Sequence, residues 1–187
     1  MKKEEICVRT DPVCTVWRTE TDVPMQEYLA GCVNVGYFLE MCKACPNYNS
    51  RWSCPSFDFD PMEIWSRYSR LHLVAYRLVP QPGQTVQAML DAHSAEKVRM
   101  VEELTQMEAA EPGSLALWAG TCGLCARCAR ADGAPCRRPT EMRHSIEALG
   151  GDVGKTAERY LGRPVLWIRG QTLPEYLMLI GGLLCGE

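Results

Sequence analysis

The distribution of cysteine is the feature that most limits what this chain can fold into. The chain has 187 residues and 11 cysteines, and seven of the cysteines fall in two short segments. They are Cys42, Cys45 and Cys54 in the first segment and Cys122, Cys125, Cys128 and Cys136 in the second. Cysteines that serve only as small core hydrophobes would not cluster in this way. The clustering therefore predicts two loops, residues 42–55 and 121–137, that carry metal or redox chemistry.

The composition is that of an ordinary folded protein and argues against several classes of function. Residues are 47% hydrophobic and 23% charged, which is typical of a globular fold. Lys and Arg number 20 against 23 Asp and Glu, so no general basic surface for nucleic acid is expected. The longest apolar stretch, residues 177–185, is too short to span a bilayer, and no secretory signal is apparent. We therefore expect a protein of the cytoplasm, a compartment in which disulfides are rare. We expect no membrane or nucleic-acid partner.

The second cysteine segment has the spacing Cys122-x2-Cys125-x2-Cys128-x7-Cys136. Iron–sulfur proteins use such Cys-x2-Cys-x2-Cys runs with a fourth cysteine downstream, because a cubane offers separate irons to successive thiolates. A tetrahedral zinc ion more often takes Cys-x2-Cys pairs from two separate segments. Glycines such as Gly123 let the backbone approach a cluster closely. The spacing favours a [4Fe–4S] cluster, with zinc as the alternative and a thiol or disulfide role as the third interpretation.

The first segment offers three thiols, Cys42, Cys45 and Cys54, and prolines directly follow two of them. A proline after a ligand cysteine fixes the direction in which the chain leaves the metal. Three thiolates are one short of full ligation of a cubane, and Cys32 is the nearest candidate for the fourth. Alternatively, one iron stays open, or a cysteine crosses to the other site. We therefore expect one or two clusters in total.

The pattern of apolar residues and caps predicts a single domain over residues 1–187. Asp60 and Pro61, for example, suit the N-cap and first position of a helix. Strands are expected within 5–17 and at 71–79, 114–120, 165–168 and 176–184. Helices are expected at 25–29, 61–70, 85–110, 140–149 and 152–161. This order predicts an α/β or α+β fold: a single mixed sheet of about five or six strands, flanking helices and the two cysteine loops.

Motifs around the cysteines resemble those of a known family. The first segment contains Cys-Pro-Asn-Tyr and Trp-Ser-Cys-Pro, the second contains Gly-x-Pro-Cys-Arg, and Arg143-x-Ser145-x-Glu147 follows. From about Tyr28 to the C-terminus the sequence resembles the prokaryotic family of cysteine-rich predicted metal-binding proteins called domain of unknown function 2284. The family's usual Cys-Pro-Pro is Cys54-Pro55-Ser56 here. The resemblance implies a cytoplasmic metal- or iron–sulfur-binding protein and implies no established reaction.

Three functions are open at this point. The favoured one is an iron–sulfur protein that carries electrons to or from a partner redox enzyme. The second is an enzyme in which a three-cysteine cluster keeps an open iron, beside a pocket, as a Lewis acid or sulfur carrier. The third is a zinc-stapled interaction module. No base or nucleophile stands out, so catalytic residues are unknown. A group of arginines could offset the charge of a thiolate-bound cluster or dock an acidic partner: Arg127, Arg130, Arg137, Arg138 and Arg143.

The Cys45→Ala variant tests whether the first segment binds metal. If there are two independent clusters, this substitution should roughly halve the iron content of anaerobically prepared protein, because one thiolate ligand is removed from one of them. Iron and sulfide quantification measures the effect. An unchanged iron content would refute a metal role for Cys45.

Overall fold

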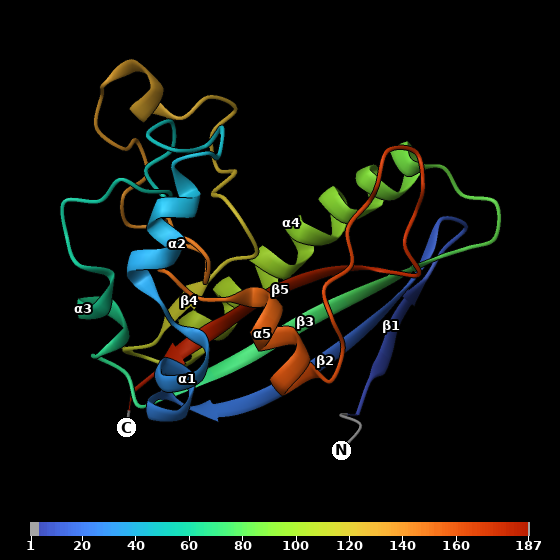
Figure 1. The fold of residues 1–187 in the computed structure, drawn as a ribbon, viewed down its shortest axis with the longest axis horizontal. Coiled ribbons are helices and arrows are strands. Elements are labelled where there is room, and N and C mark those ends of the chain that lie inside the picture. The colour runs from blue at the N-terminus through green and yellow to red at the C-terminus, as the bar shows by residue number, and fades with distance from the viewer. Residues whose placement is uncertain (1–3, 187) are drawn as a thin grey trace.

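The computed structural model describes residues 4–186, which form one five-stranded sheet in the order β1-β2-β3-β5-β4 (Figure 1). All four strand pairings are antiparallel. The strands are β1 Ile6–Thr10, β2 Cys14–Pro24, β3 Arg70–Pro80, β4 Leu115–Leu117 and β5 Leu177–Cys185. The fold is therefore α+β, one of the two expected classes. The single sheet is confirmed, but it is antiparallel throughout rather than mixed.

Helices pack on both faces of this sheet (Figure 1). They are α1 Met25–Cys32, α2 Val35–Cys42, α3 Pro61–Trp65, α4 Val86–Ala110 and α5 Val153–Thr156. A short 3-10 helix spans Ala129–Asp132, and α5 continues as a π-helical turn over Ala157–Leu161. The long helix α4 covers one face, while α1 and α5 lie on the other. This arrangement leaves the two cysteine segments at one end of the sheet, beyond α2 and β4.

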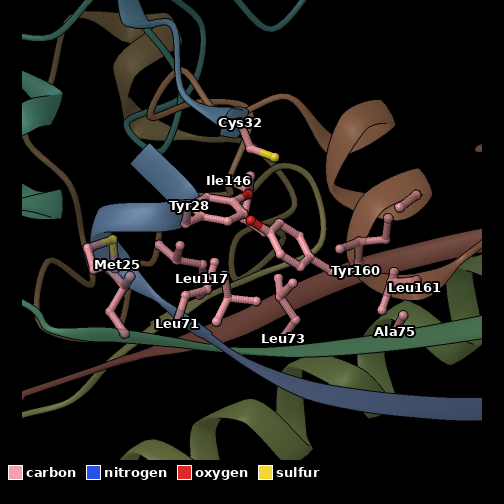
Figure 2. Close-up of a cluster of buried hydrophobic side chains, with 14 of the residues drawn as sticks. Met25, Tyr28, Cys32, Leu71, Leu73, Ala75, Leu117, Ile146, Tyr160 and Leu161 are labelled. Atoms are coloured by element: carbon pink, nitrogen blue, oxygen red, sulfur yellow. The ribbon is translucent and has the colours of Figure 1, made fainter. Parts of the chain in front are cut away.

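Alternation along the strands divides the apolar side chains between two cores. Leu71, Leu73 and Ala75 of β3 face α1 and the turn after α5, where they meet Tyr28 and Tyr160 (Figure 2). Successive side chains of a strand point to opposite faces, so the intervening β3 residues pack against α4 instead. Each helical layer is thus held by burial of apolar surface on its own side of the sheet.

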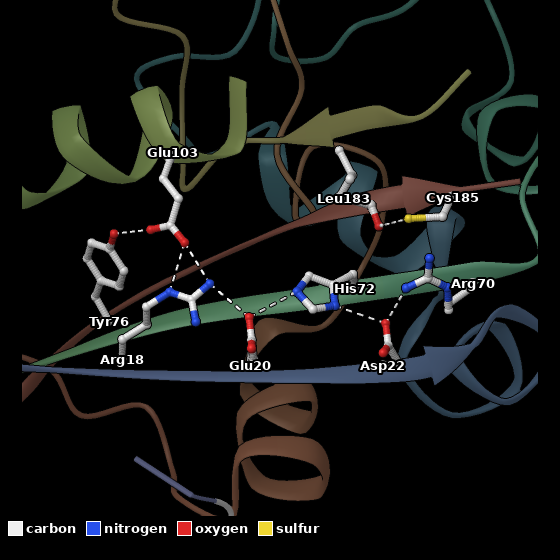
Figure 3. A network of polar contacts seen from close by, with 9 residues as sticks. All are labelled: Arg18, Glu20, Asp22, Arg70, His72, Tyr76, Glu103, Leu183 and Cys185. Carbon is white, nitrogen blue, oxygen red and sulfur yellow. Dashed lines mark hydrogen bonds and ion pairs between the residues drawn. The ribbon is translucent and has the colours of Figure 1, made fainter. Parts of the chain in front are cut away.

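Charged side chains link α4 to the sheet on the face that α4 covers (Figure 3). Arg18 on β2 donates a 2.8 Å hydrogen bond to Glu103 of α4 and forms a 2.8 Å ion pair with Glu20. His72 on β3 lies between the carboxylates of Glu20 and Asp22, at 3.3 and 2.9 Å. This row of polar side chains crosses from β2 to β3, and its cross-strand contacts support the register of the pair beside the helix.

The C-terminal strand β5 lies inside the sheet, between β3 and β4, and two glycines allow its close packing. A Cβ atom added to Gly181 would lie 2.7 Å from the Leu117 carbonyl oxygen and 2.7 Å from Leu104 of α4. One added to Gly182 would lie 2.7 Å from the His72 carbonyl oxygen. Any side chain at these positions would push β4, α4 or β3 away from β5.

Most of the expected elements are present, with shifted ends. The Asp60 cap is confirmed, since its carboxylate accepts from the Met62 N–H at 2.9 Å, but α3 ends at Trp65 rather than near residue 70. The helix expected at 85–110 is confirmed as α4, with Thr85 as its N-cap. The helix α2 falls in a region where the sequence predicted none. Cys42 consequently ends a helix instead of opening a loop.

Two expected elements are not formed. Residues 140–149 contain turns rather than a helix, because Arg143 donates to the carbonyls of Thr140 and Met142. The Trp118 N–H donates a hydrogen bond to the His144 carbonyl, which in a helix would accept from an N–H of the same helix. Residues 165–168 have no regular secondary structure and pair with no strand of the described chain. Both segments instead contribute side chains to the walls of cavities that are described below.

The Gly181→Ala variant should lose about 1–3 kcal/mol of unfolding free energy, because the added methyl overpacks against a backbone oxygen that cannot rotate away. Urea titration followed by circular dichroism measures the loss. Gly36→Ala in α2 is the matched control, since within residues 4–186 no heavy atom lies within 4 Å of the position that its Cβ would take. That control should be neutral or slightly stabilising. Equal stability of the two variants would contradict the close packing of β5.

Candidate metal centre

The two cysteine segments lie side by side although about 70 residues separate them in the sequence (Figure 1). The Ser53 hydroxyl accepts a 3.0 Å hydrogen bond from the Cys122 N–H. The Arg51 guanidinium donates to the Cys122 carbonyl at 3.2 Å. The Trp52 indole N–H donates to the Ala134 carbonyl at 3.0 Å. Three consecutive residues of the first segment thus hold the second one in place.

Arg130 completes this junction from the opposite side. Its guanidinium donates to the Cys54 carbonyl at 2.7 Å, to the Arg51 carbonyl at 3.2 Å and to the Asn49 side chain at 3.0 Å. It also lies 4.9 Å from the centre of the Trp52 ring, within cation–π range. The planar guanidinium of Arg130 therefore donates to several carbonyls of a loop whose backbone forms few hydrogen bonds of regular secondary structure.

The four cysteines of the second segment line one small cavity of about 20 Å³. The residues around it are Arg51, Trp52, Ser53, Cys122, Leu124, Cys125, Cys128, Cys136, Arg138 and Met142. All 11 cysteines of the chain lie in the described part, and each carries a free thiol. Burial raises the pKa of Cys122, and the neighbouring thiols Cys136, Cys125 and Cys128 raise it further. These four thiols therefore form one electrostatic group around a shared space.

The three cysteines of the first segment are also neighbours. Cys42 ends α2, Cys45 follows in a turn closed by its N–H to the Cys42 carbonyl at 3.0 Å, and Cys54 is buried. Burial raises the pKa of Cys54, and Cys45 and Cys42 add to the effect. Burial likewise raises the pKa of Cys42, with contributions from Cys45 and Glu147. The fold thus brings these three together beside the second segment.

Cys32 lies elsewhere. It is the last residue of α1 and is buried in the apolar core with Tyr28 and Ile146 (Figure 2). Burial raises the pKa of Cys32, while a hydrogen bond with Thr156 of α5 lowers it. The structure places this thiol in the packing between α1 and α5, away from the first cysteine segment.

The donor chemistry of the cavity suits a thiophilic metal. Four thiols and no carboxylates line it, and soft thiolate ligands select zinc or iron–sulfur clusters. Across residues 4–186, no three His, Cys, Asp or Glu side chains are arranged as the ligands of a metal ion. The structure accordingly provides the donor set and its enclosure without showing a ligation geometry.

The arginines near the second segment have partners within the chain. Arg127 pairs with Asp132, Arg138 with Glu141, and Arg143 with Glu108 at 2.7 Å. Among the arginines that the sequence singled out, Arg138 is the one that also lines the cysteine cavity. Arg51, which was not singled out, does so as well.

Two ionisable residues next to the centre were missed by the sequence analysis. Lys97 of α4 donates to the Thr121 carbonyl at 2.7 Å, directly before Cys122. Burial lowers the pKa of Lys97, and the cation of Arg51 lowers it further. Burial raises the pKa of Glu147, although hydrogen bonds from its own N–H and from Ser145 partly offset this. Lys97 belongs to no motif, and a lysine in a helix usually faces solvent. Glu147 belongs to the motif Arg143-x-Ser145-x-Glu147, but the sequence analysis assigned it no role at the centre.

Comparison with known proteins agrees with this donor set. A family model described as "Predicted metal-binding protein (DUF2284)" matches residues 34–185. The chain belongs to this family. The matched range includes both cysteine segments and excludes Cys32, β1 and β2, and the expected resemblance is thereby confirmed. No curated protein and no solved structure was found to match. In addition, no described helix of this DUF2284 member combines the length and apolar character needed to cross a membrane.

Replacing Arg130 by methionine should loosen the junction without unfolding the sheet. Hydrogen bonds from a charged donor contribute about 1–3 kcal/mol each, and partial exposure reduces this. We expect amide hydrogen exchange to accelerate about tenfold or more at 42–55 and 121–137, with 71–79 and 86–107 unchanged. Arg127→Met, which removes an exposed ion pair with Asp132, is the control and should leave both segments protected. Faster exchange in all four ranges would contradict a local role for Arg130.

Proposed function

We propose that this DUF2284 protein binds an iron–sulfur cluster through Cys122, Cys125, Cys128 and Cys136 and carries electrons to or from a partner redox enzyme. The observation that carries the proposal is that these four thiols line one cavity. Their spacing is the one that cubane-binding loops use. A bound [4Fe–4S] cluster would supply one-electron redox chemistry.

The residues around the cavity support such a role. Trp52, Leu124 and Met142 provide apolar walls that limit the access of water. Arg51 and Arg138 bring positive charge to the same walls, which offsets the negative charge of four thiolates. Solvent exclusion and nearby charge are the means by which a protein adjusts the potential of a cluster.

The first segment is a candidate second site, with Cys42, Cys45 and Cys54 as ligands. The hydrogen bond between Ser53 and the Cys122 N–H keeps the first segment next to the four cysteines of the second segment. Electron transfer between two clusters requires such proximity. Cys45 is exposed, so this segment reaches the surface where a partner could dock. We propose no fourth cysteine here, because Cys32 packs in the core.

A second candidate function is an enzyme that uses an open iron of this three-cysteine site as a Lewis acid or sulfur carrier. One specific observation favours it: a cavity of about 440 Å³ includes Lys97 and Glu147, the residues adjoining the cysteine segments. An open iron would need a pocket of this kind nearby. The zinc-stapled module is the third candidate.

Anaerobic reconstitution with iron and sulfide tests the proposal. The wild-type protein should gain stoichiometric iron and sulfide and a visible absorption band, and Cys125→Ser should lose most of both. Cys7→Ser is the matched control, because Cys7 is exposed on the edge strand β1, and it should keep the wild-type content. Zinc bound without sulfide would instead identify the zinc module. An equal loss of iron in the Cys7 and Cys125 variants would overturn the assignment of ligands.

A further inference from the structure

One sizeable cavity in the described part of the chain lies beside the candidate metal centre, and the proposed electron-transfer function makes no use of it. Its volume is about 440 Å³, within the range of small-molecule sites. It lies between the first half of α4, the start of β5 and residues 165–168. Its apolar walls include Leu90, Val153, Val165, Trp167, Ile168 and Ile180.

The sheet itself creates this space. Within the described residues, β4 pairs with β5 only from Gly182 to Leu184. The preceding part of β5, residues 177–181, therefore has β3 on one side and no strand on the other. Residues 165–168, which were expected to form a strand, lie across this gap as a wall. The cavity is thus part of the architecture and does not depend on the position of one side chain.

Three polar side chains reach this apolar space: His93 and Lys97 from α4, and Glu147 from the turn before α5. The Oε2 atom of Glu147 is cut off from solvent and has no hydrogen-bond partner among the described residues. Buried polar atoms in native proteins nearly always have a partner, so Glu147, a residue of the cavity wall, carries one unused hydrogen-bonding atom. Lys97 provides a cation in the same wall.

We propose that this cavity binds a small organic carboxylate with an apolar body, whose carboxylate lies between Lys97 and Glu147. The ammonium of Lys97 donates to one carboxylate oxygen, and the protonated Glu147 carboxyl donates to the other. The apolar body fills the space between Leu90, Val165 and Ile180. The inference goes beyond the proposed electron-transfer function and does not depend on it.

The charges of the cavity select this ligand class. An ammonium ligand could pair with Glu147 but would lie beside the cation of Lys97, whose pKa burial and the cation of Arg51 already lower. Burial raises the pKa of Glu147, which favours the protonated carboxyl that can donate to an anion. A neutral amide carries no charge that could pair with the Lys97 ammonium. A carboxylate satisfies both side chains, since charge-assisted hydrogen bonds are the stronger ones.

Binding can be measured with matched probes on the full-length protein. Phenylacetate, cinnamate and hexanoate are compared with their amides and with phenethylamine, by ligand-observed NMR and by tryptophan fluorescence. Trp167 is 71% exposed on the wall of the cavity, so the part of the fluorescence change that Trp167→Phe removes reports on this site. We expect at least one of the carboxylates to bind saturably and at least tenfold more tightly than its amide, and the amine not to bind.

Variants then locate the carboxylate. Lys97→Met should weaken binding of the carboxylate at least tenfold, whereas Lys155→Met, at an exposed lysine of α5, should not change it. Glu147→Gln keeps a donor and should preserve binding, while Glu147→Leu should abolish it. Val165→Phe fills the cavity from a loop and should block binding even if Lys97→Met fails to fold. Iron content is measured on each variant, so that a disturbed metal centre is distinguished from a lost ligand site.

Several outcomes would overturn the proposal. These are the absence of saturable binding for all three carboxylates, equal affinity for the amides, tighter binding of the amine, or undiminished binding in the Val165→Phe variant. Loss of iron with retained carboxylate binding would count against the electron-transfer function alone. Retained iron with no carboxylate binding would count against this inference alone.

Discussion

The position of β5 inside the sheet, between β3 and β4, is the constraint on which the rest of the structure depends. A C-terminal strand placed between β3 and β4 must have neighbours on both edges and both faces, and Gly181 and Gly182 allow their close approach. Through β4 this strand sets where residues 118–122 leave the sheet. It thereby sets where the second cysteine segment begins. Because β4 is short, the same arrangement leaves one edge of β5 uncovered, and the large cavity lies along that edge.

The cysteine segments depend on a second, local constraint. Loops with few aliphatic side chains bury little apolar surface to offset the entropy of ordering them. Here Arg51, Trp52 and Ser53 of the first segment form hydrogen bonds with backbone groups of the second. In return, Arg130 of the second segment donates to a backbone carbonyl of the first. His144 adds a contact at 3.1 Å to the Ser53 carbonyl and packs against Phe57 and Phe59. The thiols are thus held together by polar contacts, and metal ligation would add to an existing enclosure.

The metal centre and the large cavity are linked through α4. Lys97 lies in the cavity wall and holds the Thr121 carbonyl, one residue before Cys122. Glu147 lies in the same wall and contributes to the raised pKa of Cys42. Charge introduced into the cavity would therefore act on both cysteine segments through these two residues.

Most of the helices and strands, and the clustering of the thiols, could be predicted from the sequence alone. The cysteine spacing, the Asp60 cap and the periodicity of α4 are local patterns, and local patterns can be recognised without knowing the fold. The fold was needed to show that β5 lies between β3 and β4, that the sheet is antiparallel throughout and that Cys32 packs in the core. It also decided that residues 140–149 form no helix, because the competing partner of the His144 carbonyl is the N–H of Trp118, 26 residues away. The roles of Lys97 and Glu147 likewise come from burial beside chain segments distant in sequence, which no local pattern encodes.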